Sequence, residues 1–468
     1  MDEKISVCLI NDSFPPLIDG VANTVKNYAD IINKKHGKAV VAVPYYPKAD
    51  DSKFPYKVVR FPSINTEKFV GYRTGFPFFA ETLDEIKSEN INIIHTHCPF
   101  TSALLARTLR EPLDAPVVFT YHTKFDIDIE SAVKNSYIKK KVLGYLVDNI
   151  EACDEVWVVS EGAGENLRSI GYKGEYFVMQ NGVDIPKGRV SDDFIEEVTG
   201  GYNIPNEIPV FLFVGRMNWY KGLKIIEDSL AKIKSDGKDF RMVFIGGGRD
   251  FDDVKKYSAE LKIEENCLFL GPIRDREKLR AWYSRADLFL FPSVYDTNGL
   301  VIREAAASEL PSLIIEKSCA AEGITDGYTG FLAENNAEAF AKKLSEICDN
   351  RALLKEVGKN AMDKIYISWE DAVMAATERY KTVIEKYKAG KYERKQSFSD
   401  EWFNAEGELL DAINRAEKLR KRAKTAVINY GKGKNRAIKN SAKEFYHGMN
   451  EKRRKITKAL RKKLDMFL

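Results

Sequence analysis

The stretch LFPSVYDTNGLVIREAAASELP, residues 290–311, contains most of one strand–loop–helix unit. The run 287–291 predicts a buried strand, and a polar loop follows it. Gly299 then opens a helix of small residues over 300–308, which Pro311 stops. Backbone N–H groups at a helix start have no intrahelical partners, and the helix dipole there favours an anion. We therefore expect an anionic ligand at the start of this helix.

Two carboxylates lie on either side of the expected anion site. Asp296 precedes the helix, and Glu304 lies one turn inside it. This arrangement suits a ligand with a diphosphate in the middle and hydroxyl-rich groups at both ends, and a nucleotide-sugar is such a ligand. The alternative is an ordinary strand–loop–helix unit of an α/β protein.

Short apolar strands alternate with helical stretches along the chain. Strands are expected at 5–10, 39–43, 58–61, 91–95, 117–121, 156–160 and 176–180, and a second series begins at 210–214. This alternation predicts parallel sheets with helices on both faces, whose ligands bind at the carboxyl ends of the strands. The loop after the first strand contains Gly20, which permits a ligand to approach the backbone closely, although a plain turn is the alternative.

The composition indicates a soluble protein of two domains with a basic tail. A chain of 468 residues is too long for one compact core. Residues 391–468 contain 22 Lys and Arg against 10 Asp and Glu, so the net charge of this segment is +12. Because the net charge of the whole chain is +4, the residues before the segment have a net charge of −8. Such a tail indicates an acidic partner, either nucleic acid or an anionic membrane.

The cysteines and apolar runs indicate the compartment. The six cysteines are scattered without a Cys-x-x-Cys pair, which favours reduced thiols in a cytosolic protein. No apolar run approaches the ~18–20 residues of a transmembrane helix, and the first residues lack the apolar length of a signal peptide.

Two cations follow the strand at 210–214. Arg216 can hold a diphosphate through its fork of donors, and Lys221 adds a compact positive charge. If the diphosphate of a nucleotide-sugar departs as a leaving group, negative charge grows on it, and fixed cations would lower the barrier to that step. Two surface cations present by chance are the alternative.

These motifs together resemble the glycosyltransferase family 4 enzymes, which are retaining transferases of the GT-B fold. Residues 290–311 resemble their Glu-x7-Glu signature, with Asp296 in place of the first Glu. Residues 215–222 resemble their Gly-Arg-x4-Lys-Gly, and 181–184 resemble their Asn-Gly-Val-Asp domain boundary. The resemblance covers residues 1 to about 388 and does not include the tail.

The resemblance implies an α/β fold with two Rossmann-like domains that face each other across a cleft. Residues 1–185 would form the acceptor domain, completed by a crossover helix at 369–388. Residues 186–368 would form the nucleotide-sugar domain, and 391–468 would be a basic helical tail.

The resemblance also implies roles for individual residues. His122 would hydrogen-bond the donor sugar or its phosphate, Arg216 and Lys221 would hold the diphosphate, and Glu304 would bind ribose hydroxyls. Asp296 would contact the sugar and, because Asp is shorter than Glu, leaves the identity of the sugar open. Further donor contacts are expected at Gly20, Gly247, Ile273, Asn298, Gly299 and Leu300. The nucleotide-sugar is a substrate, so no cofactor is expected.

No metal is expected either. His95-Thr96-His97 invites a metal interpretation, but a structural zinc site needs four ligands at recognisable spacing and no second cluster appears. We expect a polar cluster that faces the cleft instead. The pattern Asp126-Ile127-Asp128 is similar to a metal-binding motif of a different glycosyltransferase fold and is not assigned a metal.

The resemblance is nearest to bacterial lipid glycosyltransferases. It favours transfer of glucose from UDP-glucose to diacylglycerol by a protein bound peripherally to the inner face of the cell membrane. The alternatives are a soluble or protein-linked acceptor, and phosphatidylinositol with a mannosyl donor. A non-enzymatic alternative is an inactive transferase fold that binds nucleotide or nucleic acid, which the intact Arg216, Lys221 and Glu304 disfavour.

Two segments could contact a membrane. The helical stretch 131–152 combines lysines with apolar residues, and either a solvated face or a membrane surface would account for it. In the tail, Ile456, Leu460, Leu464 and Phe467 share one helical face among cations, which favours an anionic membrane surface. A solvated helix and a nucleic-acid arm are the alternatives, and no nucleic-acid partner is expected.

Overall fold

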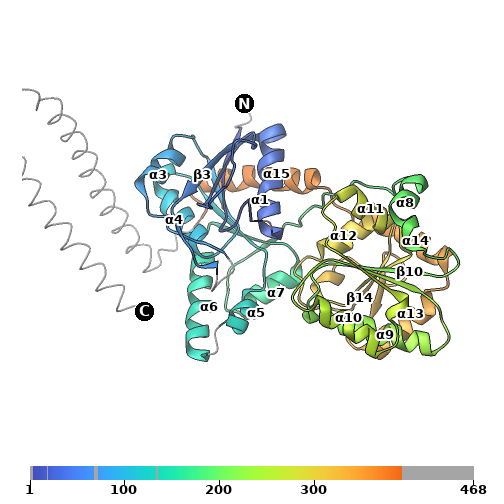
Figure 1. The fold of residues 1–468 in the computed structure, drawn as a ribbon. Coiled ribbons are helices and arrows are strands. Elements are labelled where there is room, and N and C mark those ends of the chain that lie inside the picture. The colour runs from blue at the N-terminus through green and yellow to red at the C-terminus, as the bar shows by residue number, and fades with distance from the viewer. Residues whose placement is uncertain (1–3, 18, 68–71, 133–134, 393–468) are drawn as a thin grey trace, which may run out of the picture. The chain divides into compact units, whose positions relative to one another are not determined.

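The computed structural model describes residues 4–17, 19–67, 72–132 and 135–392. The predicted basic helical tail and its membrane partner therefore lie outside the described residues. Within the described part, two parallel sheets with flanking helices form two Rossmann-like domains, which confirms the predicted α/β fold (Figure 1).

The first domain has a seven-stranded parallel sheet in the order β3-β2-β1-β6-β7-β8-β9. Its strands are β1 (Ile5–Ile10), β2 (Gly37–Pro44), β3 (Lys57–Phe61), β6 (Ile93–Thr96), β7 (Val117–Tyr121), β8 (Glu155–Val158) and β9 (Phe177–Val178), and β4 (Ser63–Ile64) pairs separately with β5 (Thr74–Gly75). Its helices are α1 (Gly20–Ile31), α3 (Ala80–Lys87), α4 (Thr101–Leu113), α5 (Phe125–Ala132), α6 (Ser136–Glu151) and α7 (Glu161–Ser169).

The second domain has a six-stranded parallel sheet in the order β12-β11-β10-β13-β14-β15. Its strands are β10 (Val210–Val214), β11 (Arg241–Ile245), β12 (Cys267–Gly271), β13 (Leu288–Phe291), β14 (Ser312–Ile315) and β15 (Phe331–Ala333). Its helices are α8 (Asp192–Thr199), α9 (Leu223–Ser235), α10 (Phe251–Glu260), α11 (Arg276–Arg285), α12 (Leu300–Ala307), α13 (Ala337–Ile347) and α14 (Arg351–Lys364).

Different helices cover the two faces of the first sheet. Val7 and Leu9 of β1 pack in one core cluster with Tyr28 of α1, whereas Cys8 and Ile10 pack in another with Leu105 of α4. Successive side chains of a strand point to opposite faces, so a strand that is covered on both sides must be apolar almost throughout. This requirement explains the nearly unbroken apolar runs of the sequence.

The helix α15 (Trp369–Lys388) returns from the second domain to the first, beside α1 (Figure 1). Tyr380 is fully buried there and stacks on Trp157 at a centroid distance of 5.2 Å. Its hydroxyl also lies 2.5 Å from Nδ1 of His95. The first core therefore contains side chains from both ends of the described chain.

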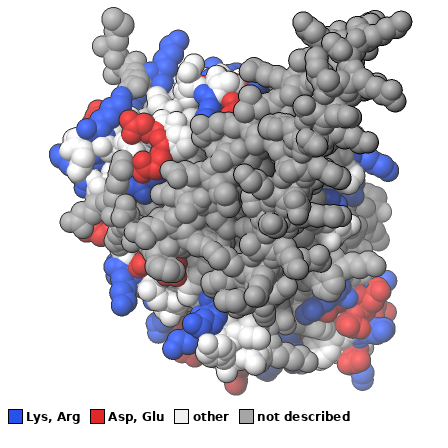
Figure 2. All heavy atoms as spheres, turned by 90° about the vertical axis from the view of Figure 1, so that its left-hand side faces the viewer, with Lys and Arg blue, Asp and Glu red and all other residues white. Residues whose placement is uncertain are grey.

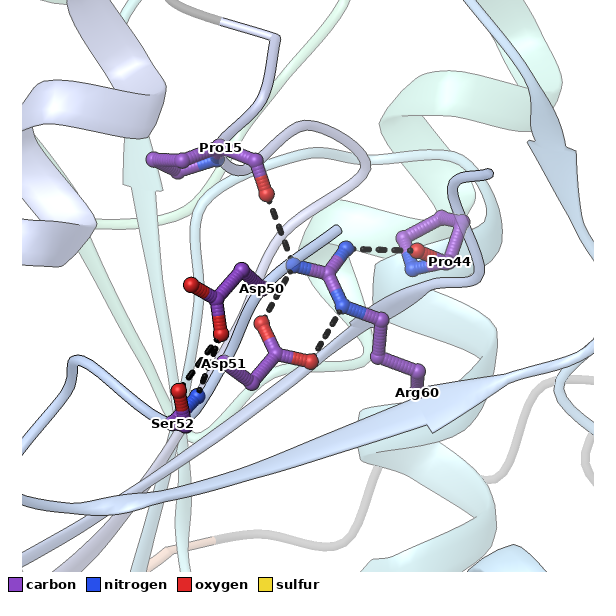
Figure 3. A network of polar contacts seen from close by, with 6 residues as sticks. All are labelled: Pro15, Pro44, Asp50, Asp51, Ser52 and Arg60. Carbon is purple, nitrogen blue, oxygen red and sulfur yellow. Dashed lines mark hydrogen bonds and ion pairs between the residues drawn. The ribbon is translucent and has the colours of Figure 1, made fainter. Parts of the chain in front are cut away.

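Arg60 of β3 fixes the loop after β1. Its guanidinium donates to both carboxylate oxygens of Asp51, at 2.7 and 2.8 Å, and to the carbonyl oxygens of Pro15, at 2.7 Å, and Pro44, at 3.3 Å (Figure 3). A planar guanidinium group that donates hydrogen bonds in several directions has few alternative orientations. The loop that leads to Gly20 is thus held against the edge of the sheet.

The helix expected over 131–152 is wrong in its limits, because the structure has α5 and α6 there. α6 begins after Asn135, whose side chain accepts hydrogen bonds from the backbone N–H groups of Tyr137 and Ile138. An asparagine that caps a helix in this way starts a new helix rather than continuing an old one.

The described surface carries charges of both signs, and basic and acidic side chains are interspersed on the face in Figure 2. Across the ranges that the structure describes, none of the helices combines the length and the apolar character required to cross a bilayer.

Tyr380→Phe should lower the free energy of unfolding by about 1–3 kcal/mol, because it leaves Nδ1 of the buried His95 without its partner. Tyr380→Ala should cost about 3–5 kcal/mol, because a cavity is added to that loss. Urea denaturation measures both values. Met374→Ala is the matched control, because Met374 lies on the same helix and is 51% exposed. Equal stability of the Phe variant and the unaltered chain would contradict this account.

Candidate functional site

The sequence predicts an anionic ligand at the start of α12, and the backbone there has a defined geometry. Gly299 has a left-handed backbone, with φ of +55°, immediately before Leu300 begins the helix. An added Cβ there would lie 3.0 Å from Ile302 and 3.1 Å from Ala320, so a larger residue would be strained by both conformation and space. The glycine therefore sets the direction in which the first N–H groups of α12 point.

Asp296 and Lys221 form an ion pair in front of α12, with 2.6 Å between Nζ and Oδ1. The other oxygen of Asp296 is buried and has no hydrogen-bond partner among the described residues, and neither does Oδ1 or Nδ2 of Asn298. Buried polar groups are nearly always satisfied, so three unpartnered atoms from one loop indicate that a polar ligand or water completes the site.

The loop after β10 approaches the loop of Asp296 by a close backbone contact. Gly222 has φ of +79°, and an added Cβ would lie 2.3 Å from the carbonyl oxygen of Pro292. This approach brings Lys221 next to the loop of Asp296. Arg216, on the same loop, is exposed and has no ionic partner within the described ranges.

The glycine turn after β11 packs against the same loop. An added Cβ at Gly246 would lie 1.8 Å from the carbonyl oxygen of Gly215, and one at Gly248 would lie 2.4 Å from that of Met217. Gly247 has ordinary space, and its carbonyl accepts from the N–H of Met217. Packing therefore requires the two flanking glycines, and the donor contact expected at Gly247 stays a prediction.

Glu304 is held by two residues that the sequence reasoning missed. Oε1 lies 2.6 Å from Nη2 of Arg276, and Oε2 accepts from the hydroxyl of Tyr283 at 3.0 Å. Burial raises the pKa of Tyr283 well above its ordinary value, so the phenol keeps its proton and donates it. Both residues belong to α11, which follows β12. Ile273, in the segment between β12 and α11, packs against the core. The position of Arg276 and Tyr283 after this segment is the only sequence signal that could have indicated them as partners of Glu304.

His122 lies at the carboxyl end of β7 and contacts a second histidine. Its Nε2 lies 2.9 Å from Nδ1 of His97, and both rings are buried. Burial lowers the pKa of His122 to about 3 and that of His97 well below its ordinary value, so both imidazoles are neutral.

The expectation that His95 faces the cleft is wrong. Its two ring nitrogens pair with Tyr380 and, at 2.7 Å, with the hydroxyl of Thr120 inside the first core. Residues alternate along β6, so His95 and His97 share one face of the strand, and α15 covers the position of His95. The helix comes from a distant part of the sequence, which is why the local pattern gave no indication of it.

Contacts between the domains bring His122 to the loop of Asp296. The hydroxyl of Thr297 donates to the carbonyl of His122 at 2.6 Å, and Ser160 donates to the carbonyl of Thr297 at 2.5 Å. Glu322 accepts from the N–H groups of Glu161, at 2.7 Å, and Gly162, at 2.5 Å, at the start of α7. Of the expected site residues, the structure thus brings His122, Lys221, Asp296, Asn298, Gly299 and Leu300 to one region.

The space next to the Cα atom of Gly20 is open, so the donor contact expected there stays a prediction. Gly20 begins α1, and an added Cβ would meet nothing within 4 Å. Asp19 caps the helix by accepting from the N–H of Ala22 at 2.8 Å.

In the described ranges, no group of three or more His, Cys, Asp or Glu side chains is arranged to hold a metal ion.

Two family descriptions match most of the described chain. Residues 18–187 match the family described as Glycosyltransferase Family 4, and residues 194–364 match Glycosyl transferases group 1. The two matches correspond to the two parallel sheets.

Curated relatives are 21–26% identical to this chain. An alpha-monoglucosyldiacylglycerol synthase of Streptococcus pneumoniae is 25% identical over 307 residues, which are 65% of this chain and 69% of the relative. One from Acholeplasma laidlawii is 22% identical over 365 residues, 75% of this chain and 90% of the relative. A D-inositol 3-phosphate glycosyltransferase of Corynebacterium kroppenstedtii is 26% identical over 376 residues, 75% and 79% of the two chains.

Solved structures share the fold. Anabaena HepE in complex with UDP superposes with a TM-score of 0.65 at 16% identity, over 81% of this chain and all of that one. Sucrose-phosphate synthase of Thermosynechococcus elongatus superposes with a TM-score of 0.65 at 20% identity, over 82% of this chain and all of that one.

The buried histidines should make stability depend on pH. His122 is neutral in the folded state, whereas in the unfolded chain its pKa is about 6.5. Below a pH of about 6.5 the unfolded chain therefore binds more protons at this residue than the folded chain does. The free energy of unfolding should therefore fall as the pH is lowered from about 6.5 towards 3, by up to about 1.4 kcal/mol per pH unit for this residue.

Denaturation at several pH values, compared between the unaltered chain and His122→Asn, isolates the contribution of His122. The comparison is needed because burial raises the pKa of Glu227 to about 8, and this carboxyl group acts with the opposite sign. A pH dependence that is unchanged in the variant would show that His122 is not buried in the neutral form.

Proposed function

We propose that this chain, which belongs to the family 4 glycosyltransferases and has the GT-B fold, transfers glucose from UDP-glucose to a membrane lipid such as diacylglycerol. The observation that carries the proposal is a set of three buried polar atoms on Asp296 and Asn298, beside Lys221 and the start of α12. These atoms have no hydrogen-bond partner among the residues that the structure describes. A hydroxyl-rich sugar on a diphosphate has the donors, acceptors and charge that these groups lack.

The proposed donor would extend from Asp296 to Glu304. The diphosphate would lie against Lys221, Arg216 and the first N–H groups of α12, near Gly247 and Gly20. The ribose hydroxyls would donate to Glu304, with the base near Ile273. Asp296 would then exchange its bond to Lys221 for bonds to the sugar, together with Asn298.

The proposed reaction retains the anomeric configuration. The acceptor hydroxyl attacks the anomeric carbon on the face from which the diphosphate leaves, the bond from that carbon to the phosphate oxygen breaks, and the leaving phosphate takes the hydroxyl proton. Arg216 and Lys221 stabilise the charge that grows on the diphosphate, so the step needs no bound metal. His122 would hydrogen-bond the sugar or its phosphate as a neutral imidazole.

The lipid acceptor is supported by the names of two relatives and by one surface of the first domain. α6 exposes Tyr137, Ile138 and Tyr145, with exposed fractions of 68%, 51% and 41%, and lysines 139–141 lie among them. Exposed aromatic and aliphatic side chains among cations suit the headgroup region of an anionic bilayer. The acceptor never leaves the bilayer, so the working enzyme would be bound peripherally to the inner face of the cell membrane.

Incubation of the purified chain with UDP-glucose and diacylglycerol vesicles should yield an α-linked glucolipid and UDP, detected by mass spectrometry and NMR. Turnover should persist in EDTA. The inositol phosphate relative provides the second candidate, so inositol 3-phosphate is assayed as a soluble acceptor. Glucosylation of inositol phosphate alone would contradict the lipid acceptor, and loss of turnover in EDTA that Mn²⁺ restores would contradict the metal-free step.

Lys221→Ala should lower kcat in this assay by roughly ten- to a hundred-fold, since a hydrogen bond to a charged group contributes about 1.5–3 kcal/mol. The effect on kcat should exceed the effect on UDP affinity, because the charge of the diphosphate grows in the transition state. Lys224→Ala is the matched control, because Lys224 pairs with Asp228 on the surface of α9.

Truncation after Gly390 should abolish sedimentation with anionic vesicles at low salt, because it removes the net charge of +12 on residues 391–468. UDP binding should remain, since the truncation leaves the whole described site in place. Tyr137→Ser with Ile138→Ser tests the exposed part of α6 in the full chain. Equal vesicle binding by the truncated and the full chain would contradict the role of the tail.

A further inference from the structure

Arg276 lies between two carboxylates from different parts of the chain. Its Nη2 is 2.6 Å from Oε1 of Glu304 and 3.7 Å from Oδ2 of Asp184. Asp184 belongs to the linker between the domains, and its Oδ1 accepts from Nδ2 of Asn27, in α1 of the first domain, at 3.2 Å. One guanidinium therefore joins the carboxylate of the proposed donor site to the linker and, through it, to the acceptor domain.

The two ends of the Arg276–Glu304 pair differ in exposure. The side chain of Glu304 is 12% exposed, whereas that of Arg276 is 45% exposed. Removal of the partner of a buried carboxylate leaves an uncompensated charge, which costs far more than the loss of an ion pair on the surface. Without Arg276, the side-chain partner that remains to Glu304 among the described residues would be the hydroxyl of Tyr283, on its other oxygen.

These two contacts fix the plane of the Glu304 carboxylate. A carboxylate has about four acceptor positions, and Arg276 and Tyr283 occupy one on each oxygen. Within the described part of the chain, one position on each oxygen therefore stays available, and both have a defined direction. Two adjacent hydroxyl groups, such as those of a ribose, can donate to a carboxylate that is held in this way.

We propose that Arg276 is a positioning residue for recognition of the donor ribose, acting through Glu304. It holds the carboxylate in the orientation that accepts the two ribose hydroxyls, and it transmits the position of the linker to the donor site through Asp184. This inference rests on the proposed function, which puts the ribose at Glu304.

Calorimetry of the full chain with UDP and with 2′,3′-dideoxy-UDP tests the inference. The unaltered chain should bind UDP roughly ten- to a hundred-fold more tightly, because only UDP donates to the carboxylate. In Arg276→Ala and Arg276→Gln this ratio should fall to about threefold or less, while the affinity for dideoxy-UDP stays unchanged. Arg276→Lys should recover part of the ratio, since a lysine restores the charge but not the planar fork.

Arg274→Ala is the matched control, because Arg274 is an exposed cation two residues before Arg276, in the segment that leads into α11, and should leave the ratio unchanged. A ratio in Arg276→Ala and Arg276→Gln equal to that of the unaltered chain would overturn the inference. An equal loss of affinity for both nucleotides would also overturn it, because Arg276 would then support the site in general. If the unaltered chain itself does not distinguish the two nucleotides, the proposed ribose contact fails and the inference fails with it.

Discussion

The candidate site depends on the parallel pairing of β10 with β13. The second sheet continues from β10 to β11 and β12 on one side and from β13 to β14 and β15 on the other, so the two chain directions separate between β10 and β13. The loops that follow these strands must leave the sheet side by side, which is where doubly wound folds bind ligands. The contact between Gly222 and Pro292 and the ion pair between Lys221 and Asp296 are consequences of this pairing.

The first domain depends on a similar constraint that involves α15. Tyr380 closes the core over β1 and β6 and pairs with His95. His97, which directly follows β6 on the same face, contacts His122. The carbonyl of His122 in turn accepts from Thr297 of the second domain. A helix near the end of the described chain thus supports a series of contacts that reaches the loop of Asp296.

Much of the fold could be predicted from the sequence, because parallel strands that are buried on both faces consist of continuous apolar residues. The strands at 117–121 and 210–214 have the expected bounds. The strand–loop–helix unit of β13 and α12 could be predicted because strand, loop, glycine and helix are consecutive in the sequence. Arg276, Tyr283 and the burial of His95 could not, because their partners lie 28, 21 and 285 residues away in the sequence. The cap at Asn135 was locally visible, but the helical pattern around it gave a stronger signal.

The carboxylate of Glu322 covers two backbone amides of the other domain, those of Glu161 and Gly162. Amide protons that are held in this way exchange with solvent only when the hydrogen bonds open. The start of α7 therefore contains two natural reporters, whose deuterium uptake would measure how often the contact between the domains breaks. A nucleotide that holds the domains together would slow exchange at these two amides, and the rate could be measured for each residue without attaching a probe to the protein.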